Sequence, residues 1–495
     1  MKDLKEYSLT KSLDKNIKTI QEIFCEDECI NIRRFENQYN GIKGCIFFID
    51  DMTDSTIIDE YIIRPVLENR ATPNKRDYIT YFSEQIIVSN SQRISSSMDH
   101  IVTAIVYGDT VLMVEGHSEV IIISSKGWNT RDITEPESEK VLRGPREGFI
   151  ESMAINMTLI RRKIRSRDLK FYCMTVGERT RTEVCICYID GLVHEETLDY
   201  IINKIENIST DSILDVKYIG EFIDDNPFSL FETNNFTERP DVVLGRILEG
   251  RVAVLVDGSP SVMTTPSLFA EIFMSNDDYY LNYYYSSIRR ILRLAGFIIA
   301  ISIPALYLAL VTFHQGTLPT NLLVAIYAAR TGVPFPSILE LMVLIAIFEV
   351  LREAGTRAPG SISQSLSIVG ALVLGTAAVD ARLVSAPMII IVGITAITGL
   401  MLPNISGILT ILRIFLLLLS SLLGLYGYIF GILAVTIHLF TLRSCGIPFM
   451  SGLDTFHMQH IKDTFIRAPG WYMRLRPKFM SKDFKRGSIG GKGDE

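Results

Sequence analysis

The chain has 495 residues, of which 48% are hydrophobic, and a formal net charge of −7. A negative charge balance gives no support for nucleic acid binding, and seven scattered cysteines are too few for a disulfide framework. The length corresponds to roughly three domains, and the ionisable residues are concentrated in the first part of the chain and in its last part.

Residues 1–145 are expected to form a cytoplasmic α/β subdomain. The first residues contain no apolar stretch of the signal-peptide kind, so we expect this region to stay in the cytoplasm. The patterns predict helices at 12–24 and 55–68, a strand at 45–49, two strands within 104–116 around a turn at Gly108 and Asp109, and a strand at 120–124. The polar stretch 89–97 is expected to be a loop.

Residues 146–290 are expected to form a second cytoplasmic α/β subdomain. The patterns predict helices at 149–165 and 194–207, and strands at 171–176, 184–189, 213–219 and 252–256. Because helices alternate with strands in both regions, we expect α/β folds with mixed sheets. No internal sequence repeat is evident.

Residues 291–445 are expected to form an all-α membrane domain. Leu294–Phe313 contains Pro304 and gives about 20 mostly apolar residues, the length that crosses the hydrocarbon of a bilayer. Further apolar segments lie at 338–351, 366–379, 383–402 and 405–440. The last is too long for one helix and has breaking points at Arg413, Gly424, Gly427 and Gly431. Six spans are expected, and four or five also fit.

Basic residues flank this apolar region on both sides. Arg289, Arg290 and Arg293 precede the first span and a basic tail, 446–495, follows the last, which places both ends on the cytoplasmic side. The tail also contains aromatic residues at 471 and 472. This composition favours contact with an anionic lipid leaflet rather than with DNA.

Among the ionisable residues that interrupt the apolar region, four are candidate site residues: Glu340, Glu349, Arg352 and Glu353. On a helix, Glu349, Arg352 and Glu353 share one face by their i, i+3 and i+4 spacing. A lone charge at the centre of a bilayer costs about 3 kcal/mol or more, so these side chains and Glu340 must pair, line water or lie at an interface. Three interpretations stay open: a salt bridge that packs subunits at a helix end, an ion or water path lined by Glu340 or Glu349, and a segment outside the membrane.

Residues beside these charges are candidates for gating or subunit packing: Pro334, Pro336, Gly355 and Arg357. The two prolines suit a broken helix. Arg413 and His438 are expected near helix ends. Neither a nucleophile–base pair, nor a cofactor loop, nor a set of metal ligands is recognisable, so we expect no enzyme activity, no cofactor and no metal.

Six motifs occur along the chain, in the order RGPREGF (143–149), LIRRKIR (159–165), TERPD (237–241), GRVAVLVDGSP (250–260), VPFP with LREAGTRAP (333–359) and SIVGALVLG (367–375). In their order and spacing, over most of the chain, they closely resemble the A subunit of GerA-type spore germination receptors. The resemblance implies a multi-pass protein of the inner spore membrane whose N-terminal α/β region faces the spore core.

The same resemblance implies partners. These are a B subunit that resembles amino-acid transporters and binds the nutrient, a C-subunit lipoprotein, and further copies of the A subunit in a homo-oligomeric ring that forms a nutrient-gated ion channel. A paralogous stage V sporulation membrane protein is one alternative; that group departs at the PREGF and LREAG positions, which are intact here at 145–149 and 351–355. A scaffold subunit that conducts nothing is another. A secondary transporter is disfavoured because the bundle shows no paired hydropathy pattern.

Overall fold

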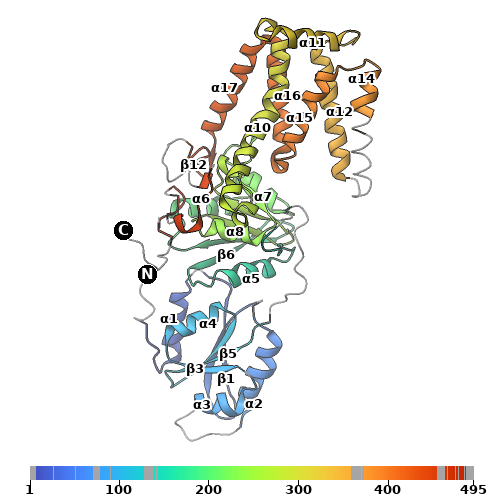
Figure 1. Cartoon of the computed structure of the whole chain (residues 1–495). Helices are drawn as coiled ribbons and strands as arrows, with labels where there is room; N and C mark the ends of the chain where they lie inside the picture. Colours follow the sequence, from blue (N-terminus) through green and yellow to red (C-terminus); the bar gives the residue numbers. More distant parts are fainter. Residues whose placement is uncertain are drawn as a thin grey trace.

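The computed structural model shows two α/β subdomains, one below the other, and a helical domain above them (Figure 1). It describes residues 7–25, 27–50, 52–70, 78–89, 91–127, 139, 143–357, 370, 373–453, 463–464, 466–473, 475–477, 479–483 and 485–486. The expected α/β region followed by a helical C-terminal part is confirmed. We call the two subdomains together the α/β body.

The first subdomain is a five-stranded sheet between two helical layers. Its strands lie in the order β1 (Ile30–Glu36), β2 (Lys43–Ile49), β4 (Asp109–Val114), β5 (Val120–Ser124) and β3 (Gln92–Ser95). One face packs against α1 (Leu13–Ile23) and α4 (Met98–Val106), and the other against η2 (Ile57–Ile63), α2 (Arg64–Glu68), α3 (Tyr78–Tyr81) and η3 (Phe82–Ile86). Ile46 and Phe47 pack into opposite layers because successive side chains of a strand alternate between its faces.

The second subdomain has the same three layers. Its strands lie in the order β6 (Leu169–Val176), β7 (Thr182–Ile189), β9 (Val252–Val256), β10 (Val262–Thr265) and β8 (Asn235–Thr237). Its two faces are covered by α6 (Glu195–Glu206) with α7 (Val216–Ile223), and by α5 (Met153–Lys163) with α8 (Pro240–Ile247). Every strand pairing within the described parts of both sheets is antiparallel, so the expectation of mixed sheets is wrong. Short hairpin connections such as β1–β2 and β6–β7 permit only antiparallel neighbours.

The two subdomains repeat one topology. When the strands of each are numbered in chain order, both sheets read 1-2-4-5-3. The repeat extends to the sequence, because CIFFID (45–50) at β2 matches CICYID (185–190) at β7, and MVEG (113–116) at β4 matches LVDG (255–258) at β9. The matches are short and far apart, which explains why the sequence alone shows no evident repeat.

The first helix of each subdomain is anchored in the same way. Asn16 in α1 and Asn156 in α5 each bond the backbone N–H and C=O of the residue six positions earlier. The first helical N–H is accepted by a carboxylate that follows the fourth strand, Glu115 at 2.7 Å in the first subdomain and Asp257 at 3.2 Å in the second. Because N–H groups at a helix start have no partner within the helix, these carboxylates fix where each helix begins.

A buried ion pair joins the two subdomains. Arg161 of α5 donates through Nη2 to both carboxylate oxygens of Asp27, at 2.9 and 2.8 Å, and neither side chain is exposed by more than 2%. The guanidinium also lies over the ring of Phe171, 4.9 Å from its centroid. Removing one partner of such a pair costs about 3–5 kcal/mol, because the other charge is left unpaired out of water. The pair therefore holds the two subdomains in one relative orientation.

Three short elements of the α/β body differ from the sequence-based expectation. Residues 104–106 are the end of helix α4 and do not form a strand. The helix begins at Met98, and its buried apolar residues follow a helical spacing from there. The strand expected at 213–219 is wrong, because α7 begins there behind its N-cap Asp215. The expected loop 89–97 contains the edge strand β3, which has a single neighbour, β5, and needs few apolar side chains.

The helical domain contains α10 (Tyr283–Thr312), α11 (Thr320–Arg330), α12 (Ser337–Arg357), η6 (Val373–Ala377) with α14 (Ala378–Asp380), α15 (Ala386–Gly399), α16 (Ser406–Leu423) and α17 (Leu425–Thr441). Within the described residues, α10 and the segment ending with α16 are long and apolar enough to cross a membrane, and α15 and α17 are shorter apolar helices. The span expected at 366–379 lies partly outside the described residues, and the number of spans stays a prediction.

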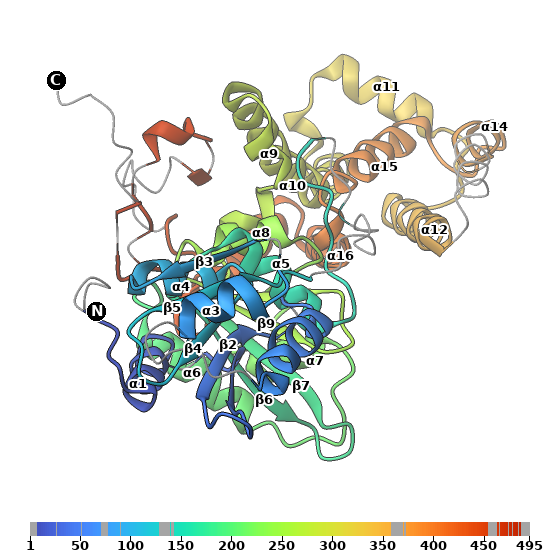
Figure 2. The ribbon, with the colours of Figure 1, turned by 90° about the horizontal axis from the view of Figure 1, so that it is seen from below.

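The helical domain is attached to the second subdomain at both of its ends. α10 leads away from the α/β body and α17 returns to it (Figure 1). After α17, the hairpin of β11 (Arg443–Ser444) and β12 (Ile447–Pro448) is bonded to the second subdomain through Ser444, whose hydroxyl donates to the Thr233 carbonyl at 2.7 Å. Seen from below, α16 lies beside the α/β body, whereas α11, α12 and α14 extend beyond its edge (Figure 2).

The expected break at Gly424 is confirmed. α16 ends at Leu423, and Gly424 has φ 63° and ψ −136°, a conformation that residues with a side chain avoid. A Cβ at this position would lie 2.9 Å from the Cβ of Phe313, just after α10. The tight connection between α16 and α17 therefore packs directly on the end of α10.

Replacing Gly424 with alanine is expected to destabilise the helical domain by about 1–3 kcal/mol, because the backbone strain and the contact with Phe313 cannot both be relieved. The measurement is the midpoint of thermal unfolding of the full chain in detergent. Gly407→Ala is the matched control, since Gly407 lies in the first turn of α16 with open space around it, and its midpoint should stay or rise. Equal midpoints for the two variants would contradict the argument.

Candidate functional site

A polar cluster lies among the apolar helices around Glu349 of α12. Its carboxylate is 2.6 Å from Nη2 of Arg352 and 3.3 Å from Nη1 of Arg413, and it accepts a hydrogen bond from the hydroxyl of Thr410 at 2.8 Å. The pair with Arg352 has the i, i+3 spacing expected from the sequence, whereas Arg413 and Thr410 belong to α16. We call these four residues the helical-domain cluster. Two guanidinium groups and one carboxylate give it an excess of one positive charge.

Arg413 also binds a carbonyl group that Pro304 leaves free. Proline has no N–H, so Pro304 cannot bond the carbonyl of Ala300 four residues earlier in α10. Nε of Arg413 donates to this carbonyl at 3.0 Å. The expectation that Arg413 lies near a helix end is wrong: its side chain is 3% exposed and lies two turns inside α16, between α10 and α12.

Glu340 belongs to a separate cluster at the end of the helical domain far from the α/β body. Its Oε1 accepts hydrogen bonds from the backbone N–H of Ser385 and, at 2.6 Å, from the hydroxyl of the same residue, just before α15. Its Oε2 lies 4.0 Å from Nε of Arg330, the last residue of α11. Glu340 therefore ties together three helix ends, and the structure does not bring it to Glu349.

The other predicted site residues lie on α12 or in the connection before it, where the Pro336 carbonyl accepts a hydrogen bond from the N–H of Glu340 at 3.1 Å. Glu353 is exposed on α12, and Gly355 is half-buried on the same helix. Pro334 and Pro336 are exposed in the connection between α11 and α12. Arg357 is the last residue of α12, and its side chain lies outside the described part of the chain.

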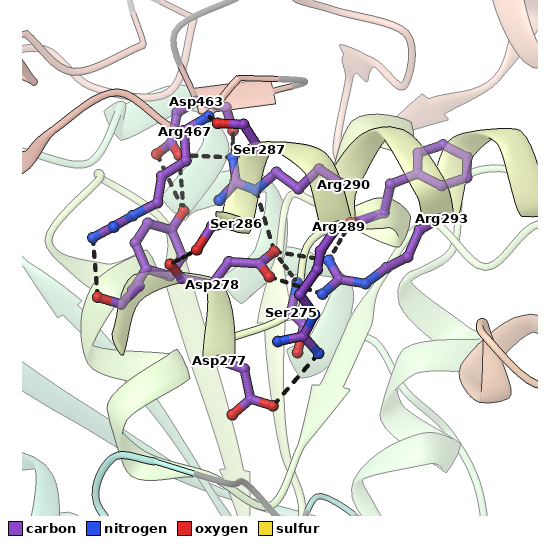
Figure 3. A network of polar contacts seen from close by, with 12 residues as sticks. Ser275, Asp277, Asp278, Ser286, Ser287, Arg289, Arg290, Arg293, Asp463 and Arg467 are labelled. Atoms are coloured by element: carbon purple, nitrogen blue, oxygen red, sulfur yellow. Dashed lines mark hydrogen bonds and ion pairs between the residues drawn. The ribbon is translucent and has the colours of Figure 1, made fainter. Parts of the chain in front are cut away.

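A third polar cluster, which the sequence analysis missed, joins the α/β body to α10 (Figure 3). Asp278 of α9 (Asp277–Tyr280) is fully buried and accepts hydrogen bonds from both Nη atoms of Arg293, at 2.7 and 2.8 Å, and from Nε of Arg290 at 3.2 Å. The backbone N–H of Ser275 completes the set at 3.2 Å. One carboxylate thus holds two arginines from the first turns of the long helix.

Residues of the C-terminal tail complete this third cluster. Nη1 of Arg290 donates to the carboxylate of Asp463 at 3.0 Å. Arg467 donates to the backbone carbonyls of Tyr279 and Leu281, each at 3.0 Å. We call Asp278, Arg290, Arg293, Asp463 and Arg467 the junction cluster. It brings the end of the second subdomain, the start of α10 and the tail to one point (Figure 3).

The charge state of Asp278 follows from its surroundings. Burial on its own raises the pKa of the Asp278 carboxyl, but the hydrogen bonds and charge of Arg293 and the charge of Arg290 outweigh it, so its pKa is lowered. The carboxylate is therefore ionised at neutral pH, and together with Asp463 it compensates the charges of Arg290 and Arg293. The only signal of this site in the sequence is an acidic pair before a tyrosine-rich stretch, 277–285, with arginines one to two helical turns later.

The basic flanks bind the protein itself. Arg290 and Arg293 are enclosed in the junction cluster, and in the tail Arg486 pairs with Glu249 at 2.7 Å and Lys482 pairs with Glu195. These four basic side chains are thus paired within the chain, and the orientation of its two ends stays a prediction. Among the described residues, no group of three or more His, Cys, Asp or Glu side chains is placed to hold a metal ion.

Comparison with known proteins identifies relatives along the whole chain. The family model described as Bacillus/Clostridium GerA spore germination protein matches residues 18–479. The uncharacterized membrane protein YfkQ of Bacillus subtilis (strain 168) is 37% identical over 97% of this chain and 94% of its own length. Spore germination protein KA of the same organism is 38% identical over 96% of this chain and 88% of its own length. Spore germination protein GerLA of Bacillus cereus is 33% identical over 95% of this chain and 96% of its own length.

This chain is also similar to a solved structure. It is the N-terminal domain of the A subunit of the Bacillus megaterium spore germinant receptor GerK3, with 29% sequence identity and a TM-score of 0.44. The match covers 53% of this chain and 98% of that domain.

Replacing Asp278 with asparagine should loosen the attachment of α10 to the α/β body, since Arg290 and Arg293 then lose their shared buried carboxylate. Removing one partner of a buried pair costs about 3–5 kcal/mol. The measurement is hydrogen exchange of the backbone amides of residues 277–290 in the full chain. Their protection factors should fall by the amount that this loss of free energy predicts. Asp59→Asn is the matched control, because the Asp59–Arg33 pair is more than half exposed and such pairs contribute about 0.2–1 kcal/mol.

The same site predicts a pH dependence. Because the pKa of Asp278 is lowered in the folded chain, its stabilising effect is complete above the unfolded value of about 3.9 and is lost as the pH falls through the folded value. Protection of residues 277–290 should therefore decrease below about pH 4 in the parent chain, and this decrease should be smaller in Asp278→Asn. An identical decrease in both proteins would show that Asp278 does not control this joint.

Proposed function

Because the chain belongs to the GerA family of spore germination receptor A subunits, we propose that it is the membrane-embedded A subunit of a nutrient germinant receptor, and that its helical domain forms a germinant-gated ion channel. The observation that carries the channel proposal is the helical-domain cluster: a carboxylate and two guanidinium groups held among apolar helices. Charges in such surroundings are energetically costly, and in membrane proteins they mark the paths of ions or water.

The outer surface of the helical domain supports embedding in a membrane. α10 and the segment ending with α16 have the length and composition of membrane spans. Large apolar side chains are exposed on several of the helices, among them Leu422, Tyr426 and Ile397, each by more than 60%. A surface of this kind is stable in lipid and not in water.

We further propose that copies of the chain assemble into a ring around the conducting path. α12 offers a face for this contact, because Leu339, Val343 and Val350 are exposed on it by 44%, 46% and 67% at helical spacing. Glu349 directly precedes Val350 of this face in sequence and has a side chain that is 18% exposed. A neighbouring copy on α12 would therefore lie next to the helical-domain cluster.

The remaining assignments follow from the family. We propose that the chain lies in the spore inner membrane with both ends on the core side and works with a transporter-like B subunit, which binds the nutrient, and a C-subunit lipoprotein. We propose the division into cytoplasmic subdomains at 1–145 and 146–290, a membrane domain at 291–445 and a C-terminal region at 446–495. A receptor subunit needs no catalytic group, and we propose no enzymatic activity.

A scaffold subunit that conducts nothing is the second candidate. It is favoured by the close pairing of Glu349, which two arginines and a threonine surround within one chain. Such a closed network packs helices without needing water. The two candidates differ in one measurable property, ion permeability.

Reconstitution in liposomes tests the channel proposal. Potassium-loaded vesicles containing the purified chain should release potassium, and Glu349→Gln should reduce the release several-fold, because the variant leaves an excess of two positive charges beside the path and cations are repelled. Glu340→Gln tests the second candidate carboxylate in the same assay.

The control for this experiment is Glu119→Gln, an exposed position in the α/β body that should leave release unchanged. Release that is the same in the parent chain, Glu349→Gln and Glu340→Gln would remove both residues from the conducting path. A complete absence of release from the parent chain and from all variants, with normal assembly of the receptor in spores, would favour the scaffold.

A further inference from the structure

The first turns of α10 bury their polar side chains and expose their apolar ones. Ser286, Arg290 and Arg293 face the protein and are buried, whereas the opposite side exposes Tyr284, Tyr285, Ile288, Ile291 and Leu292 by 51% to 68%. A helix at the surface of a soluble domain shows the reverse, with its apolar side inward and its charges in water. This segment therefore has an apolar outer face that no part of the described chain covers.

The exposed side of these turns points toward the apolar part of α10. From Ile288 it leads to Ile291 and Leu292, three and four residues later, and two turns beyond Ile291 to Ile298, which is 51% exposed. α10 has 30 residues and is thus about 45 Å long, which matches the 40–45 Å of a bilayer including its head groups rather than the ~30 Å of its hydrocarbon. The tyrosines at its start stand where aromatic belts meet the head groups.

A loop of the second subdomain carries exposed apolar side chains near the helical domain. Phe228 is fully exposed and Leu230 is 41% exposed, in the segment between α7 and β8. Next to them, the Ser229 hydroxyl lies 3.1 Å from Nε2 of His438, near the end of α17. This apolar loop therefore lies against the base of a helix that belongs to the helical domain.

Aromatic contacts connect this loop to α10. The ring of Phe231 lies 6.1 Å from that of Phe269, which lies 6.1 Å from that of Phe297 on α10. Phe297 is one turn beyond Arg293 and next to the exposed Ile298. The loop is thus linked through three rings to the part of α10 that is apolar on its outside.

We propose that the face formed by Tyr284, Ile288, Ile291, Phe228 and Leu230 is a membrane-contact rim, which lies in the boundary between the head groups and acyl chains of a phospholipid bilayer. This inference rests on the proposed embedding of the helical domain and adds that the α/β body itself touches the lipid. The bilayer then begins at Tyr284, about three helical turns before the hydropathy of the sequence places it.

The rim changes the setting of the junction cluster. Asp278, Arg290 and Arg293 lie on the inner side of the same turns of α10, so the rim places them at head-group depth and shields them from lipid by one helix. In that layer the effective dielectric is lower than in water, and the pairing of these charges is correspondingly stronger.

Spin labels test the rim in the full chain, reconstituted in nanodiscs of phosphatidylcholine and phosphatidylglycerol. A nitroxide is attached in turn at Ile288→Cys and Phe228→Cys, with Cys25, the exposed cysteine of the described chain, replaced by serine. Ile298→Cys serves as the membrane control and Tyr39→Cys, 59% exposed in the first subdomain, as the aqueous control. Collision rates with oxygen, which concentrates in lipid, and with a water-soluble nickel chelate are compared. Ile291→Cys replaces Ile288→Cys if that variant fails to fold.

We expect labels at 288 and 228 to collide with oxygen several-fold more often than with the nickel chelate, as at 298, and the label at 39 to show the reverse. A lipid-like result at 298 with frequent nickel collisions at 288 and 228 would overturn the rim while leaving the embedding intact. Few collisions with either reagent at 288 and 228 would also overturn it, because the face would then be covered by protein. Frequent nickel collisions at 298 would refute the embedding and the rim together.

Discussion

Each joint of this molecule contains an arginine that is out of water and must therefore find a compensating oxygen. Arg161 meets Asp27 between the two subdomains, Arg293 meets Asp278 between the α/β body and α10, and Arg413 meets Glu349 between helices. An unpaired charge at any of these places would cost several kcal/mol. Each ion pair forms only when the two parts of the chain that carry its charges are correctly placed. The apolar cores of the parts would permit several relative arrangements, and the ion pairs select one of them.

The fold could be predicted where one local pattern decides it. The strands at 45–49, 120–124, 184–189 and 252–256 are apolar and buried on both faces, and the break at Gly424 follows from the excess length of 405–440. The pattern failed where context decides: α7 has a short apolar run that reads equally well as a strand, and β3 is polar because it is an edge. The duplication of the α/β body was hidden because its clearest marks are single capping residues, Glu115 and Asp257, whose role depends on contacts with a distant helix.

The candidate sites, like the fold, could be predicted only where residues close in sequence determine them. The pairing of Glu349 with Arg352 could be read from spacing along one helix, whereas the contribution of Arg413 comes from another helix and depends on how the two pack. Asp278 was overlooked because nothing local distinguishes it from a surface aspartate. Its burial arises only when α10 lays two arginines over it, and the tail adds Arg467 from far along the chain.

Pro304 and Arg413 together have a mechanical consequence. A proline makes a helix easiest to bend at the carbonyl that it leaves unbonded, here that of Ala300. The guanidinium that occupies this carbonyl also holds the carboxylate of Glu349 on α12. A change in the curvature of α10 therefore cannot stay within α10: either Arg413 releases one of its two partners, or α12 is drawn along. The side chain of Arg413 therefore couples the bending of α10, which is anchored on the α/β body, to the position of α12, which extends beyond the edge of that body.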